Sequence, residues 1–115
     1  MSADMQRNPS VCRVGVGTLL ANSNEFSFHT FAGGFIHVPT GEGTPTLTFY
    51  VADGDEDDAT FNPAYDKDGV QISIAAQADR AYEINPSLFG AGRLKILADA
   101  ISGGDSVLYK IVMKS

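Results

Sequence analysis

Hydrophobic and polar residues alternate with a period of two along most of this chain. The alternation is most regular in 107–114, VLYKIVMK, where every second residue is Val107, Tyr109, Ile111 or Met113. Successive side chains of a β-strand point to opposite faces of its sheet, so this period is typical of half-buried strands. We therefore predict a strand over 107–114 with these four side chains on its buried face.

Shorter stretches with the same period, or rich in β-branched and aromatic residues, predict further strands. About eight are expected, over 11–20, 25–31, 34–38, 46–51, 70–74, 81–84, 93–98 and 107–114. In the three most regular of the others, the alternation assigns to the buried face Leu47, Phe49, Val51, Val70, Ile72, Ile74, Leu94 and Ile96. These residues, with those of 107–114, form the predicted core.

The segments between the predicted strands are rich in Gly, Pro, Asn and Asp, which are turn-forming residues. A helical turn is indicated only by NPSLFGAG at 85–92, where Asn85 can cap a turn that begins at Pro86. Many short strands favour an all-β fold, and we predict a single β-sandwich of jelly-roll or immunoglobulin-like form. The predicted organisation is a flexible polar N-terminal arm over 1–10 and one β-sandwich domain over 11–115.

Composition adds to this picture mainly by exclusion. The chain has 115 residues, 43% of them hydrophobic and 19% charged, which is ordinary for one globular domain. Its apolar runs are shorter than the roughly 20 residues that a membrane-spanning helix needs, and its first residues do not resemble a secretory signal. The net charge is −6 and the basic residues are scattered, so neither a membrane nor a nucleic acid is an expected partner.

The most acidic stretch is DGDEDDATFNPAYDKDG at 53–69, with six aspartates, one glutamate and one lysine. A run of like charges stays hydrated, so the preferred interpretation is a solvated loop. An acidic surface that meets a basic patch on a partner is a second interpretation. A third is an irregular calcium site, for which the candidate ligands are Asp53, Asp55, Asp57, Asp66 and Asp68. The spacing departs from an EF-hand loop, because its sixth position is Asp58 instead of glycine.

Other combinations of reactive residues do not make a recognisable site. His29 and His37 lie in neighbouring predicted strands, but two histidines are too few for a structural zinc site. The single cysteine, Cys12, excludes an intrachain disulfide and is expected to be a buried, inert thiol. The chain lacks a nucleophile elbow and a phosphate-binding loop motif, so we expect neither enzyme activity nor a cofactor.

The second half of the chain, 61–115, resembles a recurring pattern in small structural proteins of tailed bacteriophages. The pattern consists of a Tyr-Asp-x-x-Gly turn before a strand, a Tyr-x-Ile-x-Pro segment that ends at a glycine, an apolar strand with a central lysine, and a closing strand. The matching residues are Tyr65, Asp66, Gly69, Tyr82, Ile84, Pro86, Leu88, Phe89, Gly90, Leu94, Lys95, Ile96, Met113, Lys114 and Ser115. The matched positions belong to turns and packing, and none is an active-site residue.

This resemblance implies a virion structural protein, and within that class we favour a capsid decoration (cement) subunit. Such a subunit is made in the host cytoplasm, binds the major capsid protein on the capsid surface, and associates with itself, for example as a trimer. The expected interface residues are Phe61, Tyr65, Phe89, Asp55, Asp57 and Asp58. The alternatives are a tail- or fibre-associated domain and a host-glycan-binding module, with or without dependence on calcium.

Overall fold

The described residues fold into eight strands and two short 3-10 helices. The structure is a computed structural model, and it describes residues 10–27, 33–90 and 92–114. The strands are β1 (Ser10–Gly17), β2 (Gly33–His37), β3 (Thr46–Ala52), β4 (Phe61–Pro63), β5 (Ser73–Ala75), β6 (Ala81–Glu83), β7 (Leu94–Ala98) and β8 (Ser106–Lys114). The 3-10 helices are η1 (Leu20–Asn22) and η2 (Pro86–Gly90). Nine of the ten residues of the predicted arm, 1–9, lie outside the described residues, and Ser10 begins β1.

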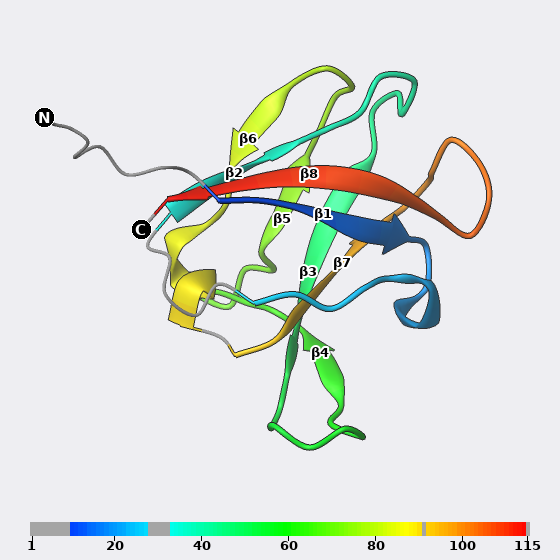
Figure 1. The fold of residues 1–115 in the computed structure, drawn as a ribbon. Coiled ribbons are helices and arrows are strands. Elements are labelled where there is room, and N and C mark those ends of the chain that lie inside the picture. Colours follow the sequence, from blue (N-terminus) through cyan, green and yellow to red (C-terminus); the bar gives the residue numbers. More distant parts are fainter. Residues whose placement is uncertain (1–9, 28–32, 91, 115) are drawn as a thin grey trace, which may run out of the picture.

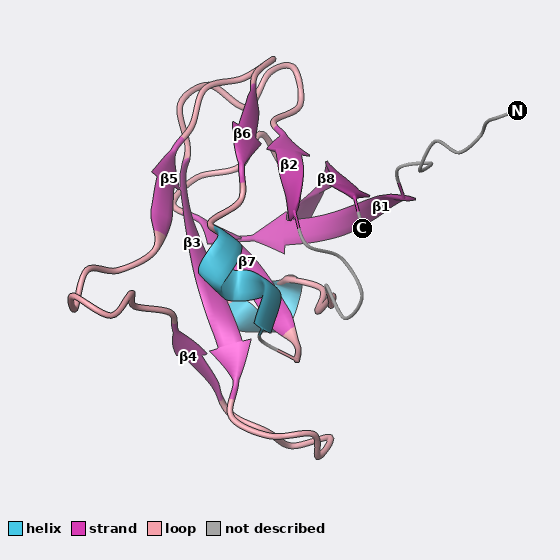
Figure 2. Cartoon of the chain, turned by 90° about the vertical axis from the view of Figure 1, so that its left-hand side faces the viewer, coloured by secondary structure: helices cyan, strands magenta, loops and turns pink. Residues whose placement is uncertain are grey.

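The strands form one continuous sheet, in the order β4-β3-β7-β1-β8-β2-β6, with β5 beside β4 along the same edge of β3. Most pairs are antiparallel, while β1 and β7 meet in parallel at a single pair, Gly17 and Leu97. The sheet curls into a half-barrel (Figures 1 and 2). The prediction of an all-β fold is confirmed, but the two-sheet jelly-roll or immunoglobulin-like sandwich is not, because the twisted sheet curls over its own core instead of packing on a second sheet.

The concave side of the half-barrel holds the hydrophobic core. The predicted alternation in β8 is confirmed, since Tyr109 and Ile111 are fully buried and Met113 is nearly so. Facing them from the other strands are Val14, Val16, Ile36, Leu47, Phe49, Leu94 and Ile96. The opposite side chains of the same strands point to the convex side, which we call the outer face.

Three strand predictions need correction. The segment 25–31 contributes only an isolated bridge between Phe26 and Leu94 in its described part, and 28–31 lies outside the described residues. Val70 is 61% exposed instead of buried, because the chain leaves the sheet between β4 and β5 and forms a hairpin there. The short strand β4 was not predicted, since its three residues, FNP, carry no alternation.

Two predicted turns are confirmed, one at 66–69 between β4 and β5 and one at 85–86 before η2. In the hairpin, the Asp66 carboxylate accepts hydrogen bonds from the backbone N–H groups of Asp68 and Val70, and Gly69 takes a positive φ of 80°. A residue with a side chain rarely adopts that φ, so glycine suits the position. At the start of η2, the Asn85 side chain accepts a hydrogen bond from the Ser87 N–H, as a helix cap does.

Candidate interaction surfaces

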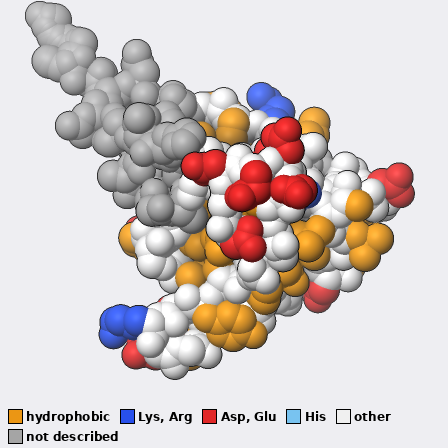
Figure 3. Space-filling model, turned by 90° about the horizontal axis from the view of Figure 1, so that it is seen from below, with side chains coloured by type: hydrophobic (Ala, Val, Ile, Leu, Met, Phe, Trp, Pro, Cys, Tyr) orange, Lys and Arg blue, Asp and Glu red, His pale blue; other side chains and the backbone are white. Residues whose placement is uncertain are grey.

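The acidic loop, 53–60, connects β3 to β4 and is closed at its base by its first and last residues. The Asp53 N–H donates to the Thr60 carbonyl (2.9 Å), and the Thr60 N–H donates to the Asp53 carboxylate (3.0 Å). Four acidic side chains beyond this base, Asp55 to Asp58, are exposed. Figure 3 shows acidic side chains gathered at the end of the molecule that is seen from below.

Arg93, just before β7, holds the backbone of this loop from the side. Its guanidinium donates hydrogen bonds to the carbonyls of Gly54 (3.2 Å) and Glu56 (2.9 Å) and to the Glu25 carboxylate (3.0 Å). The same guanidinium lies 5.7 Å from the centre of the Phe61 ring, and the Lys95 ammonium lies 4.9 Å from it. Phe61 is therefore half-buried under two cations, so its ring packs within the fold.

The carboxylates proposed as calcium ligands are not gathered at one point. Asp53 and Asp66 accept backbone hydrogen bonds in two different turns, and the other three candidates, Asp55, Asp57 and Asp68, are exposed. Within the described part of the chain, no three His, Cys, Asp or Glu side chains are grouped closely enough to hold a metal ion. The candidate ligands thus belong to two separate turns, and the choice between a solvated loop and a calcium site stays a prediction.

The hairpin, 64–72, projects from the sheet between β4 and β5 and exposes two large apolar side chains. Tyr65 is 57% exposed and Val70 is 61% exposed. The base of the hairpin is held by hydrogen bonds between Ala64 and Phe49 (2.9 Å) and between Ile72 and Ala64 (2.8 Å). A predicted interface residue, Tyr65, is thus displayed on a turn whose backbone is well ordered by its own hydrogen bonds.

The outer face of β1, β8, β2 and β6 carries a row of apolar side chains that the sequence analysis did not single out. The strand register places Val11 beside Val112 and Val112 beside Phe35. Val11 is 47% exposed and Phe35 is 48% exposed, and Leu108 further along β8 is 61% exposed. A shallow depression of about 440 Å³ lies between Phe35, Val112 and β6. Contiguous exposed apolar side chains of this kind mark interaction surfaces.

A row of basic side chains lies directly next to this apolar row. The register places Arg13 beside Lys110 and Lys110 beside His37, and all three are exposed. The two ion pairs found among the described residues, Lys67–Asp68 and Arg93–Glu25, involve neither Arg13 nor Lys110. The outer face therefore combines apolar area with unpaired positive charge, in a chain whose net charge is negative.

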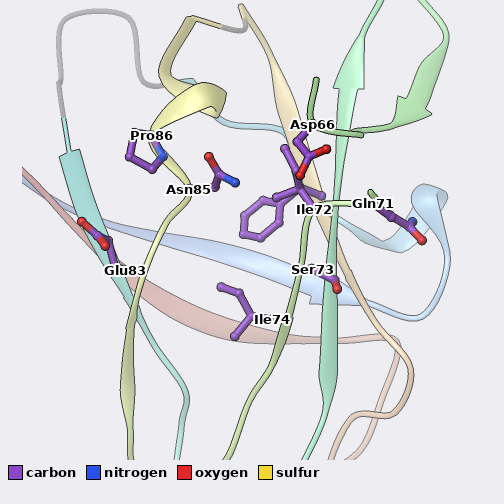
Figure 4. A pocket seen from close by; sticks show the side chains of 9 residues that line it. Asp66, Gln71, Ile72, Ser73, Ile74, Glu83, Asn85 and Pro86 are labelled. Atoms are coloured by element: carbon purple, nitrogen blue, oxygen red, sulfur yellow. The ribbon is translucent and has the colours of Figure 1, made fainter. Parts of the chain in front are cut away.

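A groove of about 400 Å³ opens where the half-barrel is incomplete, between β5 and β6 (Figure 4). Ile74 and Asn85 lie in the middle of this opening, with Glu83 to one side and Asp66 to the other. Within the described part of the chain, β5 pairs only with β3, and β6 pairs only with β2. Five of its nine lining side chains are polar, and polar groups in such a groove can orient a ligand.

The other candidate residues lie apart from these surfaces or outside what is described. Phe89 belongs to η2, but its side chain is outside the described residues, as is His29. His37 is exposed on β2, next to Lys110. Cys12 is half-buried against the core, and burial raises the pKa of its thiol, in keeping with the expected inert cysteine.

Comparison with known proteins adds no family to this description. No protein-family model, curated protein or solved structure matches the chain. The described helices are too short to cross a membrane.

The sequence of β8 did contain a sign of the apolar row on the outer face. In 107–114, the positions that alternate with the core residues are not all polar, since they include Leu108 and Val112 beside Lys110. A strand with one face in water is expected to be polar on that face. The apolar residues on both sides of β8 thus indicated a second contact surface, whose partners on β1 and β2 only the register reveals.

Proposed function

We propose that this protein is a virion structural protein, and specifically a capsid decoration subunit that binds the outside of an assembled phage shell. The phage setting rests on the resemblance of 61–115 to small structural proteins of tailed phages. The mechanism is linkage: a subunit that binds only the assembled shell stabilises that shell by its binding free energy. Many copies on a symmetric lattice add weak contacts into high avidity.

The observation that carries the proposal is the exposed hairpin with Tyr65 and Val70 at its sides. Tyrosine is enriched at the centres of protein interfaces, because it buries a large ring and keeps a polar hydroxyl. The hairpin backbone is held by the Asp66 carboxylate, so little conformational entropy is lost when it docks. The Tyr-Asp-x-x-Gly turn of the resemblance is this same hairpin, with Tyr65 on the contact surface and Asp66 and Gly69 shaping the turn.

Co-sedimentation of the purified protein with mature capsid shells from its source tests the proposal. Saturable binding of hundreds of copies per particle is the expected result. Replacing Tyr65 and Val70 by serine should weaken binding at least tenfold and leave the thermal unfolding temperature unchanged, while Lys67→Ser on the same turn serves as the matched control. Binding of only a handful of copies would overturn decoration and favour a tail- or fibre-associated subunit.

A second candidate function, recognition of a host glycan, is favoured by the groove between β5 and β6. Its rim offers carboxylates and amides, including Asp66, Gln71, Glu83 and Asn85, which pair well with sugar hydroxyl groups. Glycan binding that Asn85→Ala abolishes, with no capsid binding, would support this candidate over decoration. Sensitivity of that binding to a chelator would revive the calcium-dependent form of the hypothesis.

A further inference from the structure

The basic row on the outer face contains two like charges that lie directly opposite each other on neighbouring strands. Arg13 and Lys110 are directly opposite each other on β1 and β8, and His37 continues the row on β2. Like charges at directly opposed positions of a sheet destabilise it. None of the described acidic side chains forms an ion pair with Arg13 or Lys110. Such a local conflict is expected where a surface serves binding.

The opposite charge is concentrated elsewhere in the same molecule. The acidic loop exposes Asp55, Glu56, Asp57 and Asp58. Arg93 donates hydrogen bonds to two backbone carbonyls of this loop and to the carboxylate of Glu25, which lies outside the loop. The loop backbone is thus held in place while its four carboxylates face solvent. These carboxylates are the densest negative charge in the chain. One acidic side chain, Glu83, shares the outer face beside Phe35, and it forms no ion pair with the basic row among the described residues.

We propose that the outer face of β1, β8 and β2 is the docking site for the acidic loop of a second copy of this chain. In this contact, Arg13, Lys110 and His37 face the carboxylates of Asp55 to Asp58. The neighbouring apolar row of Val11, Val112 and Phe35 is withdrawn from water at the same time. The apolar area supplies affinity and the charges supply orientation.

The loop and the face of one copy do not meet each other. In the sheet order, β3 and β7 separate β4 from β1, and the loop extends beyond the far end of β3 and β4 (Figure 1). Pairing of two outer faces would bring their two basic rows close together, which their like charge opposes. The contact joins two different patches, so it either closes reciprocally in a two-fold dimer or repeats from copy to copy into a ring or a chain.

The first test is the mass of the wild-type protein in solution at two salt concentrations. Light scattering should show species larger than one chain in about 10 mM salt, and mostly single chains in about 1 M salt, because the Debye length falls from about 30 Å to about 3 Å. A wild-type protein that stays a single chain at low salt and high protein concentration overturns the proposal.

The second test uses two variants that each lose one side of the contact. The face variant carries Arg13→Glu and Lys110→Glu, which keeps a like-charged pair at the same cross-strand position, so its sheet carries the same conflict as the wild type. The loop variant carries Asp57→Lys and Asp58→Lys, at two exposed positions of the acidic loop. Each variant alone should be a single chain. A charge-matched control, Asp68→Lys with Asp105→Lys, should associate like the wild type.

Mixing the two variants decides between this contact and a general charge effect. The face variant still has a wild-type loop, and the loop variant still has a wild-type face, so the mixture retains one intact contact. The expected product is a one-to-one dimer that grows no further. A mixture that remains monomeric while both variants unfold cooperatively, or one that forms larger species, overturns the proposal.

This contact is separate from the proposed binding to a shell, which uses the hairpin. A face variant that still binds shells through Tyr65 and Val70 but no longer self-associates supports the contact between copies. Loss of shell binding in the hairpin variant, with unchanged self-association, bears on the decoration proposal alone.

Discussion

The outer face of the sheet carries two pairs of cations that differ in what surrounds them. Arg93 and Lys95, on the β7 side, donate hydrogen bonds to three backbone carbonyls and one carboxylate, and both cover the Phe61 ring. Arg13 and Lys110, on β1 and β8, are exposed beside each other without an ion pair among the described residues. The four residues lie on the same side of one sheet, yet among the described residues only the first pair has such partners.

The difference separates charges that hold the fold together from charges that are available to a partner. Hydrogen bonds from a cation to buried or half-buried acceptors stabilise a fold, whereas exposed charges contribute little to it. Arg93 therefore belongs to the architecture of the acidic loop. Arg13 and Lys110 belong to the surface that we assign to a second copy.

The largest effect is expected from a substitution that tests the assignment of the two faces itself. Ile111→Asp places a charge at a fully buried position of β8, with no partner for it, and should abolish cooperative folding. Val112→Asp, one residue further on, points to the outer face and should change the free energy of unfolding by less than about 1 kcal/mol. Circular dichroism during thermal unfolding distinguishes the two. Cooperative unfolding of the Ile111 variant would show that the faces are reversed.

A smaller change in the free energy of unfolding should distinguish Arg93, which is hydrogen-bonded within the fold, from Arg13, which is exposed. Arg93→Ala removes three charge-assisted hydrogen bonds and should lower the free energy of unfolding by about 2 kcal/mol, with faster amide hydrogen exchange at Thr60. Arg13→Ala should change it by less than about 0.5 kcal/mol. Urea unfolding of both variants makes the comparison, and equal losses would contradict the distinction between the two pairs.

The smallest effect concerns a buried polar group that lacks a partner on the inner side of β8. The Tyr109 hydroxyl is fully buried, and neither it nor the nearby Glu42 Oε1 finds a well-oriented hydrogen-bond partner among the described residues. Burial raises the pKa of Tyr109 well above its usual range. The Glu42 carboxylate raises it further, through its charge and a poorly oriented contact with the hydroxyl, and so does the charge of Asp99. Tyr109→Phe should therefore stabilise the protein at neutral pH by about 1 kcal/mol.

The same substitution should change how stability depends on pH. In the unfolded chain, Tyr109 ionises near pH 10, whereas in the folded protein it stays neutral to higher pH. The folding stability linked to this pKa difference is fully present below about pH 10 and is lost as the pH rises above that value. Urea unfolding at pH 8 and pH 11 should show a smaller loss of stability for the Phe variant than for the wild type. An equal loss in both would contradict the buried, unpaired hydroxyl.

The strands and their buried faces were largely predictable, because they follow from local alternation. In β3, β7 and β8, the buried residues are those that alternation along the sequence predicted. The turns at 66–69 and 85–86 were predictable because the Asp66 and Asn85 side chains accept hydrogen bonds from the backbone nearby. Val70 was assigned wrongly for a related reason. Its segment alternates like a strand, but the turn before it lifts the first residue off the sheet.

The candidate surfaces were also only partly predictable from the sequence. Acidic charge in 53–58 and an exposed Tyr65 are readable from sequence, because solvated loops are recognised by composition. By contrast, the contacts of Arg93 and Lys95 with the Phe61 ring join residues more than 30 positions apart, so no local sequence pattern predicts them. The row of Arg13, Lys110 and His37 likewise draws on three strands that are far apart in the sequence.

By itself, then, the sequence determined an all-β domain, the inner face of its main strands and an acidic loop kept in water. Each of these depends on neighbours in the chain, whose spacing and hydrogen bonds act locally. Tertiary structure alone decided that the strands close into one curled sheet and not two, because strand order depends on contacts between distant segments. It also decided which apolar and basic side chains meet on the outer face, since cross-strand register, and no property of a single strand, brings Val11, Val112 and Phe35 side by side.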